Sequence, residues 1–168
     1  MPKNETVVVG QSVKRIDARG KVTGETAYPS DIDIEGQLWL KIKFSERTHA
    51  RVLHVETSEA LALDGVVAVY TSLDIPVNEY GLVIKDQPVI CGPGSDIAGT
   101  DIVRTYMDYV AVVVAETAEI ATQALGLIQV DYEDLGSVFD PESSMLADAP
   151  QLHPDTPNNI LAQYRIRR

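Results

Sequence analysis

The sequence has almost no cysteine: Cys91 is the only one in 168 residues. A single cysteine cannot form an internal disulfide, a four-thiolate zinc site or a self-contained iron–sulfur cluster. Any redox centre with which this chain works must therefore be supplied from elsewhere.

Long hydrophobic runs and basic residues are also scarce. No apolar run approaches the ~20 residues needed to cross a bilayer, and the first ten residues lack the hydrophobic core of a signal peptide. The chain has 14 Lys and Arg against 25 Asp and Glu, a net charge of −11. Such an acidic protein repels phosphate backbones. We therefore expect a soluble cytoplasmic protein without a nucleic-acid or membrane partner.

The charge is unevenly distributed. Residues 1–24 contain five basic and two acidic side chains, residues 160–168 contain three arginines, and residues 25–159 contain six basic and 23 acidic side chains. Two interpretations remain open. The basic ends are segments that lie against an acidic surface, their own or a partner's, or they are scattered solvated charge.

Residues 108–135 predict a strand, a helix and a second strand. The continuous apolar run Val110–Ala115 is typical of a strand covered on both faces. Thr117 offers an N-cap hydroxyl for an alanine-rich helix, and Gly126 is a natural stop. Residues 128–133 then alternate between apolar and polar. We expect parallel strands joined by a right-handed crossover.

A second, similar unit precedes it. Residues 52–56 and 66–71 read as strands, and residues 57–63 between them read as a short helix that ends at Asp64-Gly65. With an alternating strand at 38–44, these units predict an α+β fold built on one mixed sheet. Shorter strands are expected at 102–106 and 138–139, and a short helix at 141–147.

The chain ends are expected to lie outside this domain. We predict a leader at 1–10, the domain at 11–147, and a linker followed by the start of a further strand at 148–168. Residues 148–159 contain three prolines, and residues 160–168 alternate between apolar and polar as a strand that lacks a partner here. Gly20 and Gly24 predict an ordered loop at 15–31, pinned by Arg15–Asp17 or Lys21–Asp31 pairing.

Few residues suggest chemistry. His49, His54 and Glu56 form the only metal-like cluster, although histidines in so polar a stretch are more often surface or structural residues. A thiol pair of Cys91 with His49 lacks a third, orienting group. We therefore assign no catalytic, metal-binding or cofactor-binding residue.

Three stretches resemble the N-terminal part of the molybdenum-binding subunit of molybdenum hydroxylases, the xanthine dehydrogenase, aldehyde oxidoreductase and carbon monoxide dehydrogenase group. Their order and spacing carry the resemblance over about residues 10–160. The stretches are Arg15-x-Asp17 with Lys21-Val-Thr-Gly24 and Ala27-Tyr28-x-x-Asp31; Ser45, His49-Ala50, Ala60, Gly65-Val66, Thr71 and Asp74-Ile-Pro76; and Val110-Ala-Val-Val-Val-Ala115, Ala121, Ala124, Val130-x-Tyr132-Glu133-x-Leu135, Leu152-His153 and Asn159-Ile160.

The resemblance implies an α/β-hammerhead domain that precedes a larger molybdopterin-binding region. The chain would be a non-catalytic scaffold and docking domain without a cofactor of its own, and Arg15, Asp17, Lys21 and His49 would take part in interdomain docking. The parent enzyme would hydroxylate a purine, aldehyde or related substrate at molybdenum-molybdopterin, with iron–sulfur and FAD on partner subunits or domains. The alternative is a free-standing binding or regulatory module with a hammerhead-like fold and no enzymatic activity.

Overall fold

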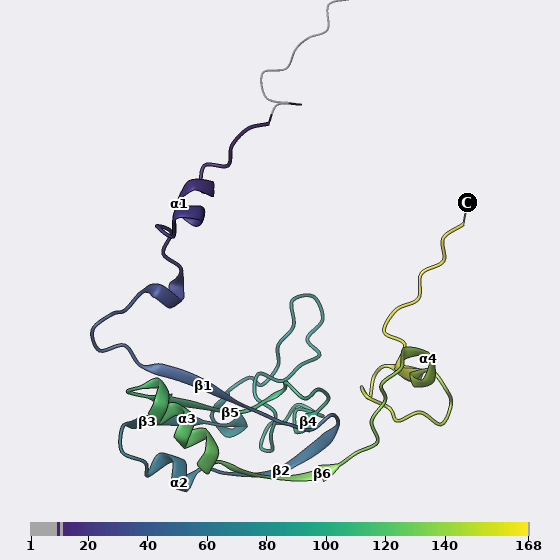
Figure 1. Ribbon diagram of the computed structural model, residues 1–168. Helices are drawn as coiled ribbons and strands as arrows, with labels where there is room; N and C mark the ends of the chain where they lie inside the picture. The colour runs from purple at the N-terminus through teal and green to yellow at the C-terminus, as the bar shows by residue number, and fades with distance from the viewer. Residues whose placement is uncertain (1–9, 11, 168) are drawn as a thin grey trace, which may run out of the picture. The chain divides into compact units, whose positions relative to one another are not determined.

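The computed structural model describes residue 10 and residues 12–167 (Figure 1). Contacts divide the chain into two compact units, with the boundary between Gln37 and Leu38. The expected leader at 1–10 lies almost entirely outside the described residues. None of the described helices is long and apolar enough to cross a bilayer.

The N-terminal unit contains the helix α1 (Ala18–Thr23) and the 3₁₀ turn η1 (Pro29–Asp31). The prediction of a loop broken at Gly20 is therefore wrong. Gly20 lies inside α1 because the chain turns back on it: a Cβ there would lie 2.7 Å from Thr26 Oγ1, and Gly20 O accepts a hydrogen bond from the Thr26 N–H. Gly24 ends the helix with a φ of 77°, as a C-terminal glycine should.

Ion pairs hold α1 at its first turn. Arg15 pairs with Asp17 at 2.9 Å, which confirms one of the two predicted contacts. Lys21 pairs with Asp17 at 2.6 Å, one helical turn away. The predicted Lys21–Asp31 pair is wrong, because the Asp31 carboxylate accepts the Tyr28 N–H at 2.9 Å. No described residue between 10 and 37 is buried, so this unit has no core of its own.

The second unit contains two three-stranded antiparallel sheets. One has the order β1-β5-β3, with β1 at Trp39–Phe44, β3 at Val66–Tyr70 and β5 at Tyr109–Ala115. The other has the order β4-β2-β6, with β2 at Ala50–Glu56, β4 at Ile102–Val103 and β6 at Gln129–Asp134. The α+β class is confirmed, but the single mixed sheet with parallel strands is wrong.

Both predicted strand–helix–strand units are present. They are β2–α2–β3, with α2 at Ser58–Leu61, and β5–α3–β6, with α3 at Ala118–Leu127. Each unit begins in one sheet and ends in the other, so its two strands never pair with each other. Instead β2 pairs with β6, and β3 pairs with β5. The expectation of parallel strands failed because the rule for crossovers applies only within one sheet.

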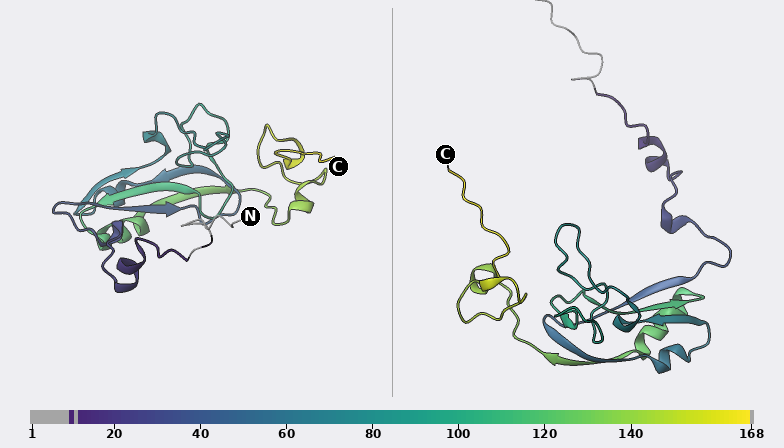
Figure 2. Two further views of the ribbon diagram at one scale, coloured as in Figure 1. Left: turned by 90° about the horizontal axis from the view of Figure 1, so that it is seen from above. Right: turned by 180° about the vertical axis from the view of Figure 1, so that it is seen from behind.

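Helix α3 packs against the sheet β1-β5-β3 through small side chains. Thr117 Oγ1 accepts the Ile120 N–H at 3.2 Å, which confirms the predicted N-cap. Ala121 and Ala124 are fully buried, and they pack in one cluster with Ala111, Val113 and Ala115 of β5. Without side chains beyond Cβ, the helix can lie close to β5 and β1 (Figure 2).

Gly126 does not end α3, contrary to the prediction, since the helix continues to Leu127. A Cβ at Gly126 would meet nothing within 4 Å, so this glycine lies over open space in the last turn. The strand that follows is confirmed: Val130 and Tyr132 are half-buried, while Gln129, Asp131 and Glu133, which alternate with them, are exposed.

A second apolar cluster lies where β2, β4 and β5 meet. It consists of Ala50, Val52, Cys91, Val103 and Val110, all at most 2% exposed. Between β3 and β4 the chain forms the 3₁₀ turn η2 (Ser72–Asp74) and a long loop. The predicted strand at 102–106 shortens to β4, because the chain turns after Arg104 to bond Asp108.

The C-terminal part contains the short helix α4 (Pro141–Ser144) and the 3₁₀ turn η3 (Pro157–Asn159). No strand forms at 138–139 or at 160–167. The side chain of Asn159 bonds Leu152 N, Ser144 O and Pro150 O at 2.8–2.9 Å. Residues 148–159, expected as a linker, are thus held as a folded loop.

Candidate functional site

His49 is a structural histidine in this chain. Its side chain is 6% exposed, and Nδ1 lies 2.6 Å from Gly136 O. Its own carbonyl accepts the Leu135 N–H, so His49 fixes the chain where it leaves β6. His54 lies on the surface beside Glu56, with 3.7 Å between Nε2 and Oε2. The three residues of the metal-like cluster are not brought together, and the described residues contain no group of three possible ligands.

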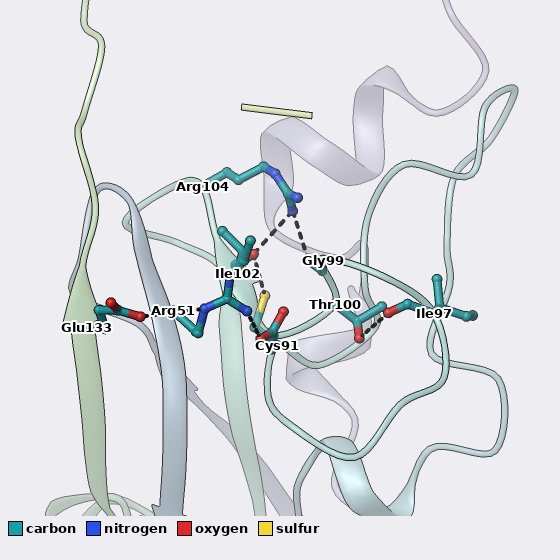
Figure 3. Close-up of polar contacts among 9 residues, drawn as sticks. Arg51, Cys91, Ile97, Gly99, Thr100, Ile102, Arg104 and Glu133 are labelled. Atoms are coloured by element: carbon teal, nitrogen blue, oxygen red, sulfur yellow. Dashed lines mark hydrogen bonds and ion pairs between the residues drawn. The ribbon is translucent and has the colours of Figure 1, made fainter. Parts of the chain in front are cut away.

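Cys91 is also a structural residue and not a nucleophile. It is buried, and its Sγ points at Ile102 O at 3.7 Å (Figure 3). Burial raises the pKa of the thiol above its ordinary value, to about 12, and the Asp108 carboxylate adds to the effect. A thiol with this pKa stays protonated at neutral pH, so it is not a nucleophile. The hypothetical Cys91–His49 pair is absent from the hydrogen bonds of the described residues, since the Cys91 thiol donates to Ile102 O and His49 Nδ1 bonds Gly136 O.

Two arginines organise the loops around β4, and sequence reasoning assigned no role to either. Arg51 on β2 forms an ion pair with Asp101, and its Nε lies 3.6 Å from Glu133 of β6. Arg51 stands between its register partners Ile102 and Glu133, so it ties both neighbouring strands to β2 (Figure 3). These two partners of Arg51 lie 50 and 82 residues away in the sequence, so no local pattern identifies the role of Arg51.

The guanidinium group of Arg104 donates hydrogen bonds to three backbone carbonyls. Its Nε donates to Leu152 O at 2.7 Å. Its Nη1 donates to Gly99 O and Ile102 O at 3.3 and 3.2 Å (Figure 3). It thereby fastens the C-terminal loop to the loop before β4. These bonds use the Nε and Nη1 donors, so Arg104 holds two parts of the chain together.

A cavity of about 480 Å³ lies beside Arg104, between the loop at 78–88 and residues 152–161. Its wall has charges of both signs, among them those of Lys85, Asp86, Arg104 and Asp155. Burial lowers the pKa of His153 in this wall, and the Arg104 cation lowers it further, so His153 is neutral at pH 7. Within the described residues, the cavity has no nucleophile with a bonded base and no converging metal ligands.

The residues expected to take part in docking lie in different settings. Arg15, Asp17 and Lys21 form the exposed ion-pair cluster at the start of α1. His49 is buried, so it could act only through the position of Gly136.

Large apolar side chains are abundant on the surface. They include four groups, in the N-terminal segment, at the start of β1, in the loop after η2 and in the C-terminal segment, and others such as Leu73 and Phe139 lie elsewhere on the surface. The members are Val13, Ile16 and Val22; Leu38, Trp39 and Leu40; Leu82, Val83 and Ile84; and Leu161, Tyr164 and Ile166. The buried core consists mainly of alanine and valine. Exposed apolar surface of this extent is typical of a domain that is covered by something else.

Comparison with known proteins gives the family. The sequence profile described as "Aldehyde oxidase and xanthine dehydrogenase, a/b hammerhead domain" matches residues 23–136. The chain belongs to this hammerhead family. The match includes both strand–helix–strand units and both sheets.

Curated relatives extend the similarity beyond the hammerhead domain. The chain is 44% identical over 148 residues to a probable xanthine dehydrogenase subunit of Bacillus subtilis, which covers 88% of this chain and 18% of that protein. It is 34% identical to the "Nicotinate dehydrogenase large molybdopterin subunit" of Eubacterium barkeri, over 89% of this chain and 33% of that protein. The hammerhead chain thus spans about a fifth to a third of the length of these relatives.

Solved structures agree. A Cu,Mo-CO dehydrogenase matches 87% of this chain and 18% of its own, with a TM-score of 0.73 and 33% identity. The aldehyde oxidoreductase of Desulfovibrio gigas matches 85% of this chain and 16% of its own, with a TM-score of 0.69 and 28% identity. The predicted resemblance to molybdenum hydroxylases, which are oxidoreductases, is confirmed.

Proposed function

We propose that this chain is the scaffold and docking domain of a molybdenum-hydroxylase large subunit. The observation that carries the proposal is the surface: four groups of large apolar side chains are exposed, while the core is built of small ones. A domain with this distribution gains stability when a partner covers it. The relatives, several times longer than this chain, provide such a partner in their remaining length.

The proposal extends to the parent enzyme. Its molybdopterin would bind in the region that follows the hammerhead domain, with iron–sulfur and FAD on partner subunits or domains and a purine, aldehyde or related substrate, in the cytoplasm. Among the described residues no three possible metal ligands come together, which supports a cofactor bound outside this chain. We therefore derive no chemical step from this chain.

Docking through the N-terminal segment is part of the same proposal. Arg15, Asp17 and Lys21 fix the shape of α1, and since none of the residues described in its unit is buried, this unit needs another surface to pack against. His49 supports docking indirectly by holding Gly136 in place.

A chimera tests the proposal. The matched 148 residues of the Bacillus subtilis relative are replaced by this chain, and the molybdenum content of the purified large subunit is measured. We expect the chimera to hold as much molybdenum as the unmodified protein. Lys21→Glu should lower this content, because it breaks the pair with Asp17. The matched control Lys14→Glu, which reverses one charge three residues before Asp17, should lower it much less.

The rival is a free-standing module of the same fold. It is favoured if the chimera folds without molybdenum while the unmodified relative retains it. Sequencing the coding region past Arg168 separates the two cases independently, because a free-standing module ends there and a large subunit continues for several hundred residues.

A further inference from the structure

The loop after η2 carries three consecutive apolar side chains at its tip. Leu82 and Val83 are 92% and 95% exposed, and Ile84 is 53% exposed. These three residues, the apolar tip, have no charged residue among them. In Figure 1 the loop is the teal segment that rises from the two sheets. Contiguous exposed apolar side chains favour aggregation unless a partner covers them, so they mark interaction sites.

The tip stands on a fixed base. Tyr80 and Gln87 exchange two backbone hydrogen bonds, with N–O distances of 2.6 and 3.1 Å, and Lys85 pairs with Glu79 at 3.3 Å. Below them Asn78 is 1% exposed. Its side chain accepts the N–H groups of Val89 and Ile90 and donates to Ile90 O. The loop is therefore a braced hairpin, residues 78–90.

The turn itself is also constrained. A Cβ at Gly81 would lie 1.7 Å from Ile84 O, so only glycine allows this close approach of the backbone. A rigid apolar tip loses little conformational entropy when it binds, which is the property of a preorganised anchor.

We infer that the apolar tip is an anchor that inserts into an apolar recess of the large-subunit region outside the matched stretch of the longer relatives. An uncharged tip offers no ion pair, so its partner must be an apolar recess; anchors of this kind fill pockets at the centre of interfaces. The Bacillus subtilis relative has about four-fifths of its length outside the match. The inference rests on the proposed function and names the element that performs the docking.

One residue of the tip, Ile84, lies close to Leu161 of the C-terminal segment. Ile84 and Leu161 both line the cavity of about 480 Å³, so the hairpin and the C-terminal segment form a projection next to a hollow. Leu161 is 68% exposed. A partner that takes the tip can place an apolar side chain against these two residues at the same time.

Cysteine labelling tests the inference. Val83→Cys is introduced into a Cys91→Ala background, both in the isolated chain and in the chimera with the Bacillus subtilis relative. The labelling rate with N-ethylmaleimide is followed by mass spectrometry of the peptide that contains residue 83. We expect labelling at least ~10-fold slower in the chimera. Gln123→Cys, on the exposed polar face of α3, is the control and should label at the same rate in both proteins.

The other outcomes overturn the inference. If residue 83 labels equally fast in both proteins while Ile16→Cys is protected in the chimera, the domain docks but the tip is not its anchor, and the proposed function stands. If neither residue is protected, both proposals fail. Slow labelling of residue 83 in the isolated chain that speeds up on dilution identifies a second copy as the occupant.

A second measurement does not depend on labelling. Leu82→Asp combined with Val83→Asp should leave the melting temperature of the isolated chain within about a degree, because both side chains are almost fully exposed. In the chimera the same pair should lower the yield of assembled protein several-fold. An unchanged yield contradicts the inference.

Discussion

At the scale of single residues, Thr117 illustrates how one hydroxyl sets the start of the central helix. Its Oγ1 accepts the Ile120 N–H at 3.2 Å. Thr117→Ala removes this acceptor and should lower the free energy of unfolding by about 1 kcal/mol. Urea denaturation measures the change, and Thr117→Ser, which keeps the hydroxyl, should recover most of it. Equal losses in both variants would show that the methyl group, and not the cap, matters.

Cys91 predicts how stability depends on pH. Its pKa is raised to about 12 by burial, so the folded protein favours the protonated thiol. The stabilisation is complete below the pKa of the unfolded thiol and is lost as the pH rises through the folded pKa. The free energy of unfolding should therefore fall between about pH 9 and 12.

Cys91→Ala provides the control for this pH dependence. The variant should show a shallower fall, measured by denaturant titration at each pH. Tyr132, whose pKa burial also raises to about 12, accounts for the part that remains. An identical slope in the variant would mean that the thiol is accessible in the folded chain.

At the scale of elements, α3 depends on small residues. Ala121 is fully buried in the cluster with Ala111 and Val113 of β5. Ala121→Leu forces the helix away from the sheet and should cost about 1–3 kcal/mol of stability by overpacking. Gln123→Leu, on the exposed face of the same helix, is the matched control and should change little. A neutral effect of Ala121→Leu in denaturant melts would contradict this packing.

The local elements were largely predictable, and the pairing of strands was not. Thr117 and the alternation after Ile128 are signals within a few residues, so the cap and β6 could be located from sequence. The helix at Ala18–Thr23 was missed because Gly20 is normally a breaker, and its compensation comes from Thr26 folding back. Register between β2 and β6 depends on residues about 80 positions apart, which periodicity cannot detect.

At the scale of the whole molecule, the isolated chain should bind no stoichiometric molybdenum, iron or flavin. The physical reasons are its single cysteine and a set of described side chains that bond to one another or to the backbone. Metal analysis and an absorption spectrum of the purified chain measure this. Stoichiometric molybdenum or iron in the purified chain would contradict this prediction.

Function was predictable only through resemblance. Hydrophobic patterning finds the core, but the residues proposed for docking are exposed charges and apolar side chains that look alike wherever they occur. The braced hairpin shows why: Leu82 and Val83 are ordinary apolar residues in the sequence, and only the bonds of Asn78 and the exposed tip distinguish them.

The exchange of strands between the two strand–helix–strand units has a consequence for synthesis on the ribosome. The sheet containing β1 lacks its middle strand until β5 is made, and β2 lacks its longer partner until β6 is made. Between Trp39 and Asp134 the nascent chain therefore cannot complete both sheets. At about 5–20 residues per second, this stretch takes roughly 5–20 s to translate. During that interval the open edges of β1 and β2 are targets for chaperones, and a ribosome stalled before Tyr109 releases a chain that cannot fold.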